Sequence, residues 1–235
     1  MSATANLFAP ENEVVEDELD APPARDALWS YTPEYHLQEP SPQAANWEGM
    51  VGRYEPRLNA ANGAVLHLGA GCGELMETLR QHGFTVMGCE RLLRPARLAH
   101  ESRGFDARTL HCSSTENFLG WMRRIGQRAQ AIFFRHDLEH CLELQALLPM
   151  MADILCDNGL LISQLPPPSA EYPHEAHLSF LNELAVACAS CNGRFEVEGV
   201  DCDYENRFMA FVLKKTFGAG KISVPAFAPP CVRPR

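Results

Sequence analysis

Short apolar runs alternate with amphipathic segments along the middle of the chain. The apolar runs have the length of strands, and the segments between them have helical spacing and end at or near a glycine. Buried strands of parallel sheets read as apolar runs, and helices connect them, so the alternation predicts a parallel sheet covered on both faces. The expected strands are 64–68, 84–90, 106–112, 129–135 and 160–165, and the expected helices between them are 73–83, 91–104, 114–126 and 142–159.

The last part of the chain's middle region departs from this alternation. A helix at 177–190 precedes two β-rich runs, 194–203 and 207–215, which only a short link separates. Strands joined so closely are antiparallel neighbours. The predicted fold class is therefore α/β, with a doubly wound, mostly parallel seven-stranded sheet whose last strand is reversed.

The two ends of the chain differ in composition from the middle. Residues 1–45 are acidic and rich in proline, which predicts a disordered or loosely draped segment, and residues 214–235 predict an irregular tail rich in glycine and proline. The domain is thus expected at 46–213, beginning with a helix up to Pro56. The N-terminus has no basic start followed by an apolar stretch, and no run reaches the roughly 18 apolar residues of a membrane span, so we expect a cytoplasmic protein.

A glycine-rich loop follows the first predicted strand. Gly69, Gly71 and Gly73 let the backbone approach a ligand without a Cβ in the way, beside the N-terminus of a helix. The loop lacks the Gly-Lys-Ser/Thr sequence of a P-loop, and Glu74 stands where a GxGxxG dinucleotide motif has its third glycine. A glutamate in the first helical turn would repel a pyrophosphate. The loop therefore favours a nucleotide-like cofactor with no phosphate at this point.

An acid ends the second predicted strand. Glu90 lies about twenty residues beyond the loop, and a carboxylate at that strand end can accept two hydrogen bonds from ribose hydroxyls. Capping of the following helix is the alternative role for Glu90. Ligands of doubly wound sheets bind outside the carboxyl ends of the strands, so the loop and Glu90 together predict one cofactor site.

These segments, with the "LEH" stretch of residues 138–140 after the fourth strand, resemble the class I S-adenosylmethionine-dependent methyltransferases over residues 64–213. The resemblance implies a Rossmann-like methyltransferase fold, methyltransferase activity and S-adenosylmethionine as cofactor. It also implies that the loop wraps the methionine moiety, that Glu90 holds the ribose, and that Arg91 and residues 112–114 border the adenine. The implied cofactor-binding residues are Gly69, Ala70, Gly71, Cys72, Gly73, Glu90, Arg91, Ser113, Ser114 and Arg135.

Two residues depart from the family pattern. His67 stands two residues before Gly69, where the family usually has an acid, and Gln130 stands where the family usually has an aspartate opening the fourth strand. The change at His67 would weaken cofactor binding or reshape the methionine end of the site. A non-catalytic cofactor-binding or scaffold relative of the fold is therefore a second hypothesis.

Histidines and acids gather after the fourth and fifth predicted strands. One hypothesis is a general base, His140 or His177, because an imidazole pKa of about 6.5 suits proton removal from an acceptor hydroxyl. Another is a divalent metal site, similar to the E-x-x-E-H site of small-RNA 2′-O-methyltransferases and quinone-biosynthesis O-methyltransferases, with a histidine in place of the first glutamate. A third is that the "LEH" residues only cap and pack. The metal ligands would be His136, Glu139, His140 and His177.

The chain carries a formal net charge of -10 at pH 7, and its basic residues form no clear cluster. Such a charge disfavours a polyanionic substrate. We therefore expect O-methylation of a small metabolite by in-line displacement with a histidine base, in preference to N-methylation or metal-assisted RNA 2′-O-methylation. The expected partner is a small-molecule methyl acceptor, with neither nucleic acid nor membrane.

Overall fold

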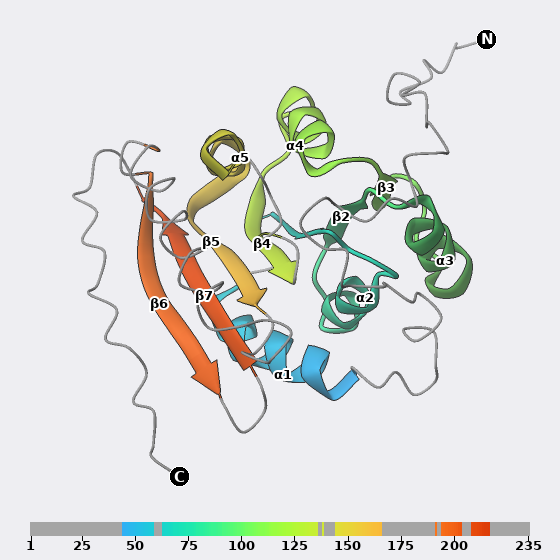
Figure 1. The fold of residues 1–235 in the computed structure, drawn as a ribbon, viewed down its shortest axis with the longest axis horizontal. Coiled ribbons are helices and arrows are strands. Elements are labelled where there is room, and N and C mark those ends of the chain that lie inside the picture. Colours follow the sequence, from blue (N-terminus) through green and yellow to red (C-terminus); the bar gives the residue numbers. More distant parts are fainter. Residues whose placement is uncertain are drawn as a thin grey trace, which may run out of the picture. The chain divides into compact units, whose positions relative to one another are not determined.

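The structure is a computed structural model that describes residues 44–58, 63–135, 138, 144–165, 191, 194–203 and 208–216 (Figure 1). Within these residues seven strands form a mixed sheet in the order β3-β2-β1-β4-β5-β7-β6. β1, β2 and β3 pair in parallel, whereas β7 runs antiparallel to both β5 and β6. The predicted α/β fold class with a reversed last strand is confirmed.

The described helices and strands follow the order that the sequence predicts. They are α1 (Ala44–Tyr54), the 3₁₀ helix η3 (Glu55–Arg57), β1 (Ala64–Leu68), α2 (Glu74–Gln81), β2 (Val86–Glu90), α3 (Leu93–Arg103), β3 (Leu110–Cys112), α4 (Thr115–Arg124), β4 (Ala129–Arg135), α5 (Leu144–Ile154), β5 (Leu155–Leu165), β6 (Phe195–Asp203) and β7 (Phe208–Lys215). Among the described residues, no helix has the length and apolar character that crossing a membrane requires. The predicted helix at 177–190, the N-terminal segment up to residue 43 and the tail beyond 216 lie outside the described residues.

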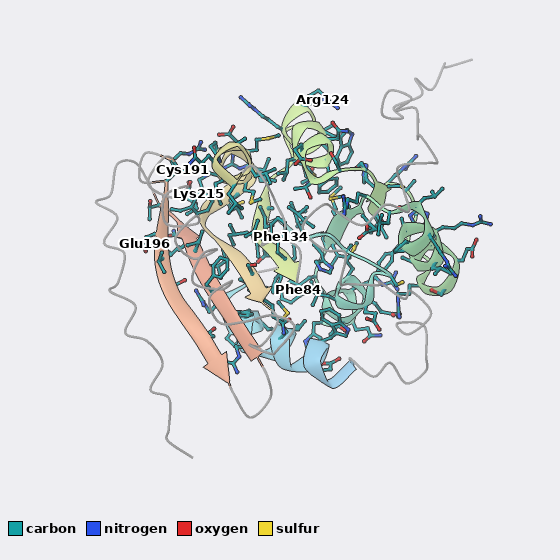
Figure 2. All side chains as sticks on the ribbon, viewed as in Figure 1. Phe84, Arg124, Phe134, Cys191, Glu196 and Lys215 are labelled. Carbon is teal, nitrogen blue, oxygen red and sulfur yellow. The ribbon has the colours of Figure 1, made fainter. Side chains whose placement is uncertain are left out.

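Several predicted boundaries are wrong: β2 and β3 begin later than predicted, at Val86 and Leu110, and the largest error lies between α5 and β5. The helix expected over 142–159 ends at Ile154, and β5 begins at Leu155. Asn158 has a φ of 62°, so the backbone turns at the Asn-Gly pair within the strand and not at a helix end. Lys215 is the last residue of β7 (Figure 2). Its ammonium group donates a hydrogen bond to the Leu155 carbonyl at 2.5 Å. This contact between residues far apart in the sequence gives Leu155 a partner outside the helix, which local spacing could not predict.

The chain divides into two compact units, one up to Ala129 and one from Gln130. In the second unit β5 pairs with β7 over Leu160–Leu165, and β6 pairs with β7 along its length, with a bulge at 197–199. The two strands β6 and β7 lie side by side in orange in Figure 1. The core of this unit is built from side chains that are 0% exposed, among them Ile132, Phe133, Phe134, Leu148, Met151, Leu161, Ile162 and Leu213.

In the first unit β1 is buried along its whole length. A strand that is buried on both faces needs apolar side chains at consecutive positions, and the sequence "AVLHL" meets this need at all positions except His67. α2 places Leu75, Met76 and Leu79 in the core at 0% exposure, and α1 packs against α2. This packing fixes the two ends of the glycine-rich loop, which joins β1 to α2.

His82, at the C-terminal end of α2, links that helix to α1 and η3. Its Nε2 lies 3.0 Å from a Glu48 carboxylate oxygen, and its Nδ1 lies 3.1 Å from a Glu55 carboxylate oxygen. The hydrogen bond to Glu48, opposed in part by burial and reinforced by Glu55, raises the pKa of His82 above 6.5. The protonated imidazole can donate to both acids at once, which a neutral ring cannot do.

Stability is therefore expected to depend on pH through His82. Because the folded pKa exceeds the unfolded one, the His82 contribution is complete below about pH 6.5 and is lost as the pH rises through the folded value. Urea unfolding at pH 6 and pH 8.5 should show a larger loss of stability for the wild type than for His82→Gln. Equal losses in the two proteins would contradict this assignment.

Candidate functional site

The glycine-rich loop connects the end of β1 to the start of α2. Gly69, Gly71 and Gly73 have φ angles of 68°, 54° and 78°, a left-handed conformation that residues with side chains rarely adopt. The Ala70 N–H donates to the Cys89 carbonyl on β2, and the Gly73 N–H donates to the Ala70 carbonyl, both at 2.9 Å. The loop is thus a tight turn attached to the neighbouring strand, and this geometry explains the alternate glycines.

Glu90 is the last residue of β2, and its carboxylate contacts the loop directly. One oxygen accepts a hydrogen bond from the Gly71 N–H at 2.8 Å, and the other accepts one from the Leu92 N–H at 2.8 Å. Leu92 is the N-cap residue of α3, so the helix-capping role is present together with the contact to the loop. Glu90 is 7% exposed. The carboxylate therefore joins the end of β2, the glycine-rich loop and the start of α3 at the place where a nucleotide ribose would lie.

Two serines follow β3, whose last residue Cys112 pairs with Glu90. The Ser113 N–H donates to the Glu90 carbonyl at 3.0 Å. The Ser113 hydroxyl oxygen is buried and has no hydrogen-bond partner among the described residues. The Ser114 hydroxyl, in contrast, accepts a hydrogen bond from the Asn117 N–H at 3.3 Å and caps α4. Ser113 is therefore the hydroxyl that a ligand beside Glu90 could use, while Ser114 already serves the helix.

The remaining predicted site residues give less information. Arg91 is exposed between β2 and α3, and Arg135 ends β4. Within the part of the chain that the structure describes, no group of three His, Cys, Asp or Glu side chains is arranged to hold a metal ion. The general-base and metal hypotheses stay predictions, because their residues lie outside the described ranges: His136, Glu139, His140 and His177.

The two residues that depart from the family pattern are both buried. His67 on β1 is 2% exposed, and Gln130 near the start of β4 is 5% exposed. The His67 ring lies edge-on to the Trp47 ring, with 6.5 Å between the ring centroids. The Trp47 indole N–H donates to the Glu74 carboxylate at 3.2 Å. Glu74, which the sequence suggested only as a charge that repels pyrophosphate, is thus a buried acid bonded to α1.

Arg103, the last residue of α3, contacts the same region and was missed by the sequence analysis. Its guanidinium donates through Nε to the Cys72 carbonyl at 2.9 Å and through Nη1 to Glu77, and its Nη2 lies 3.7 Å from Glu74. The Arg103 side chain is 7% exposed. The available signal was the pair of acids three residues apart in the first turn of α2, which suggests a cation nearby but does not identify it.

Several solved structures that resemble this chain are methyltransferases. The plantazolicin methyltransferase BpumL, in complex with a monoazolic desmethylPZN analog and SAH, aligns with a TM-score of 0.56 and 10% identity, over 78% of this chain and 88% of that one. The mitomycin 7-O-methyltransferase MmcR aligns with a TM-score of 0.53 and 15% identity, over 75% of this chain and 55% of that one. A putative SAM-dependent methyltransferase from Streptococcus mutans aligns with a TM-score of 0.50 and 13% identity, over 74% of this chain and 49% of that one. The chain spans about half the length of the last two proteins.

No curated protein sequence matches the chain at a significant level. A family model described as a methyltransferase domain matches residues 43–190, which is more than half of the chain. That range contains the glycine-rich loop, Glu90 and Ser113, and the TM-score of 0.56 to BpumL indicates a shared fold. The chain therefore belongs to the methyltransferase domain family, and it has the fold of the class I S-adenosylmethionine-dependent methyltransferases.

Proposed function

We propose that this protein transfers the methyl group of S-adenosylmethionine to an oxygen atom of a small molecule. The observation that carries the proposal is the Glu90 carboxylate, which ends β2 and binds the glycine-rich loop, at the position where an acid accepts hydrogen bonds from ribose hydroxyls. The net charge of -10 supports a small acceptor, since it disfavours polyanions. The name of MmcR, a 7-O-methyltransferase of the same fold, supports oxygen as the methylated atom.

The described residues fit the chemical groups of this cofactor. The loop leads into the N-terminus of α2, where backbone N–H groups can donate to the methionine moiety, and Arg103 offsets the negative charges of Glu74 and Glu77. Glu90 offers acceptors to the ribose, and the Ser113 hydroxyl, which has no partner among the described residues, offers a donor to an adenine nitrogen. The proposed cofactor-binding residues are Gly69, Ala70, Gly71, Cys72, Gly73, Glu90, Arg91, Ser113, Ser114 and Arg135.

The chemistry of the cofactor determines which steps of methyl transfer the protein itself has to perform. When bound, S-adenosylmethionine supplies a methyl group on a positively charged sulfur that needs no further activation. The chain has to hold the cofactor, align the acceptor oxygen and exclude water. A hydroxyl acceptor must also lose a proton, and we propose His140 or His177 as the base. In the metal-assisted alternative, which includes RNA 2′-O-methylation, a divalent cation would lower the pKa of the acceptor hydroxyl. The ligands of this cation would be His136, Glu139, His140 and His177.

A second candidate is a cofactor-binding protein without transfer activity. The buried His67, at a position where the family usually has an acid, favours it. This candidate retains the same glycine-rich loop and the same Glu90 contacts. It differs from the first proposal only in lacking turnover.

Calorimetric titration of S-adenosylmethionine into the purified protein tests the proposal. We expect a micromolar dissociation constant, which corresponds to about -7 to -8 kcal/mol, and competition by S-adenosylhomocysteine. Absence of both heat and competition would overturn cofactor binding.

A panel of hydroxylated small molecules then distinguishes the two candidates. The release of S-adenosylhomocysteine with any acceptor supports the enzyme, while binding without release across the panel supports the non-catalytic protein. Loss of turnover with EDTA would favour the metal-assisted alternative. If turnover is lost in His140→Ala or His177→Ala and EDTA has no effect on the wild type, the result would favour the histidine base.

A further inference from the structure

Two side chains that flank α3 bind neighbouring backbone groups of the glycine-rich loop: Glu90, which ends β2 before the helix, and Arg103, which ends the helix. The Gly71 N–H is bound by Glu90, which also caps the first turn of α3 through Leu92. The Cys72 carbonyl is bound by Arg103, the last residue of α3. An acceptor in the strand that precedes α3 and a donor at the C-terminal end of α3 therefore both bind the loop.

The charges of two nearby acids explain why a guanidinium binds the Cys72 carbonyl. Glu74 and Glu77 place two negative charges in the first turn of α2, directly after the loop. Arg103 donates to Glu77 and lies 3.7 Å from Glu74. A planar guanidinium has five N–H donors in a fixed arrangement, so it can bind two acids and a carbonyl at the same time. A lysine ammonium could balance the charge but could not keep the same three directions.

Burial makes this arrangement costly to disturb. The side chains of Arg103 and Glu74 are 7% and 6% exposed, so each is largely removed from solvent. A buried charge that loses its partner is strongly destabilising, whereas a surface ion pair contributes little. Arg97 offers the comparison on the same helix: it pairs with Glu101 at 2.9 Å, with side chains that are 73% and 57% exposed.

We propose that Arg103 is a positioning residue for the cofactor site, which sets the conformation of the glycine-rich loop through the Cys72 carbonyl. The proposal rests on the function proposed above, because it concerns the same loop. Arg103 acts through the backbone and through the α2 acids, without touching the cofactor. Its loss should therefore weaken S-adenosylmethionine binding even where the fold persists.

The test compares Arg103→Lys with Arg97→Lys, which makes the same substitution on the solvent face of α3. We expect Arg103→Lys to raise the dissociation constant of S-adenosylmethionine about 10-fold, the effect of losing one charge-assisted hydrogen bond, and Arg97→Lys to leave it unchanged. Thermal unfolding of both variants shows whether the protein is folded at the assay temperature. Relative to the wild type, Arg103→Lys should speed amide hydrogen exchange at residues 69–73 more than in β1. A merely structural role would instead speed exchange in both segments and leave the affinity for S-adenosylmethionine unchanged.

The wild-type protein supplies a measurement that needs no variant. Because the Arg103 Nε–H donates to the Cys72 carbonyl, its hydrogen should exchange with solvent more slowly than that of the Arg97 Nε–H. Its NMR signal should also shift when S-adenosylmethionine is added. Wild-type affinity in Arg103→Lys, or an Arg103 Nε–H that exchanges like Arg97 and does not respond, would overturn the positioning role alone. Failure of the wild type to bind S-adenosylmethionine would overturn the proposed function and this role with it.

Discussion

Changing Glu90 to Gln is expected to raise the dissociation constant of S-adenosylmethionine at least about 100-fold, although the side chain keeps its size. The carboxylate accepts hydrogen bonds from the Gly71 and Leu92 N–H groups and, by our proposal, from ribose hydroxyls. Hydrogen bonds to a charged group contribute about 1.5 to 3 kcal/mol each. Losing two such bonds to the ribose corresponds to a change in affinity of about 100-fold or more.

The amide of a glutamine makes the change worse than a simple loss of charge. Both carboxylate oxygens face a backbone N–H at 2.8 Å, so the amide NH₂ must point its own donors at one of them. Two donors that face each other repel, and an unsatisfied buried donor costs about 1 to 3 kcal/mol. Either the loop or the start of α3 then has to move.

Calorimetric titration measures the effect, and Glu101→Gln is the matched control because it removes an exposed acid from α3. The control should bind S-adenosylmethionine like the wild type. Affinity of Glu90→Gln within about threefold of the wild type would contradict the ribose role and leave Glu90 as a helix cap and loop anchor.

Much of the fold could be predicted from the sequence because local patterns decide it. The consecutive apolar residues of β1 and β4 indicate strands buried on both faces, and Gly104, in the left-handed conformation at φ 66°, ends α3 as its position in the sequence suggested. The end of α5 could not be predicted in this way. Its apolar spacing continues beyond Ile154, and the Lys215 contact to the Leu155 carbonyl, between residues 60 apart, is not a local signal.

The candidate site also contains residues that local patterns predict and residues that they do not. The glycines and Glu90 occupy the ends of the first two strands, and the topology of a parallel sheet brings such ends together. Arg103 lies 31 residues from Cys72, and nothing in its own helix distinguishes it from the exposed Arg97. Whether Glu90 caps α3 or contacts the loop could not be decided from sequence either, because a carboxylate has the capacity to do both.

Changing Gly88 to Ala is expected to destabilise the protein by about 3 kcal/mol, the upper end of the usual cost of overpacking. Gly88 lies in β2 between β1 and β3, where it pairs with His67 and Leu110. A Cβ at this position would lie 2.5 Å from the His67 carbonyl oxygen and 2.8 Å from the Met76 sulfur. The flexible Met76 side chain can move aside, but the carbonyl belongs to a buried strand and cannot move without disturbing the pairing.

Urea and thermal unfolding measure this cost, which for a chain of this size corresponds to a fall in Tm of about 6 to 12 °C. Gly52→Ala is the matched control, because a Cβ there meets nothing within 4 Å. Gly52 lies in α1, where alanine should stabilise the helix by about 0.5 to 1 kcal/mol. The same substitution should therefore act with opposite sign at the two positions. A Gly88→Ala protein as stable as the wild type would mean that β1 and β2 can separate at His67 without cost, which their burial and parallel pairing argue against.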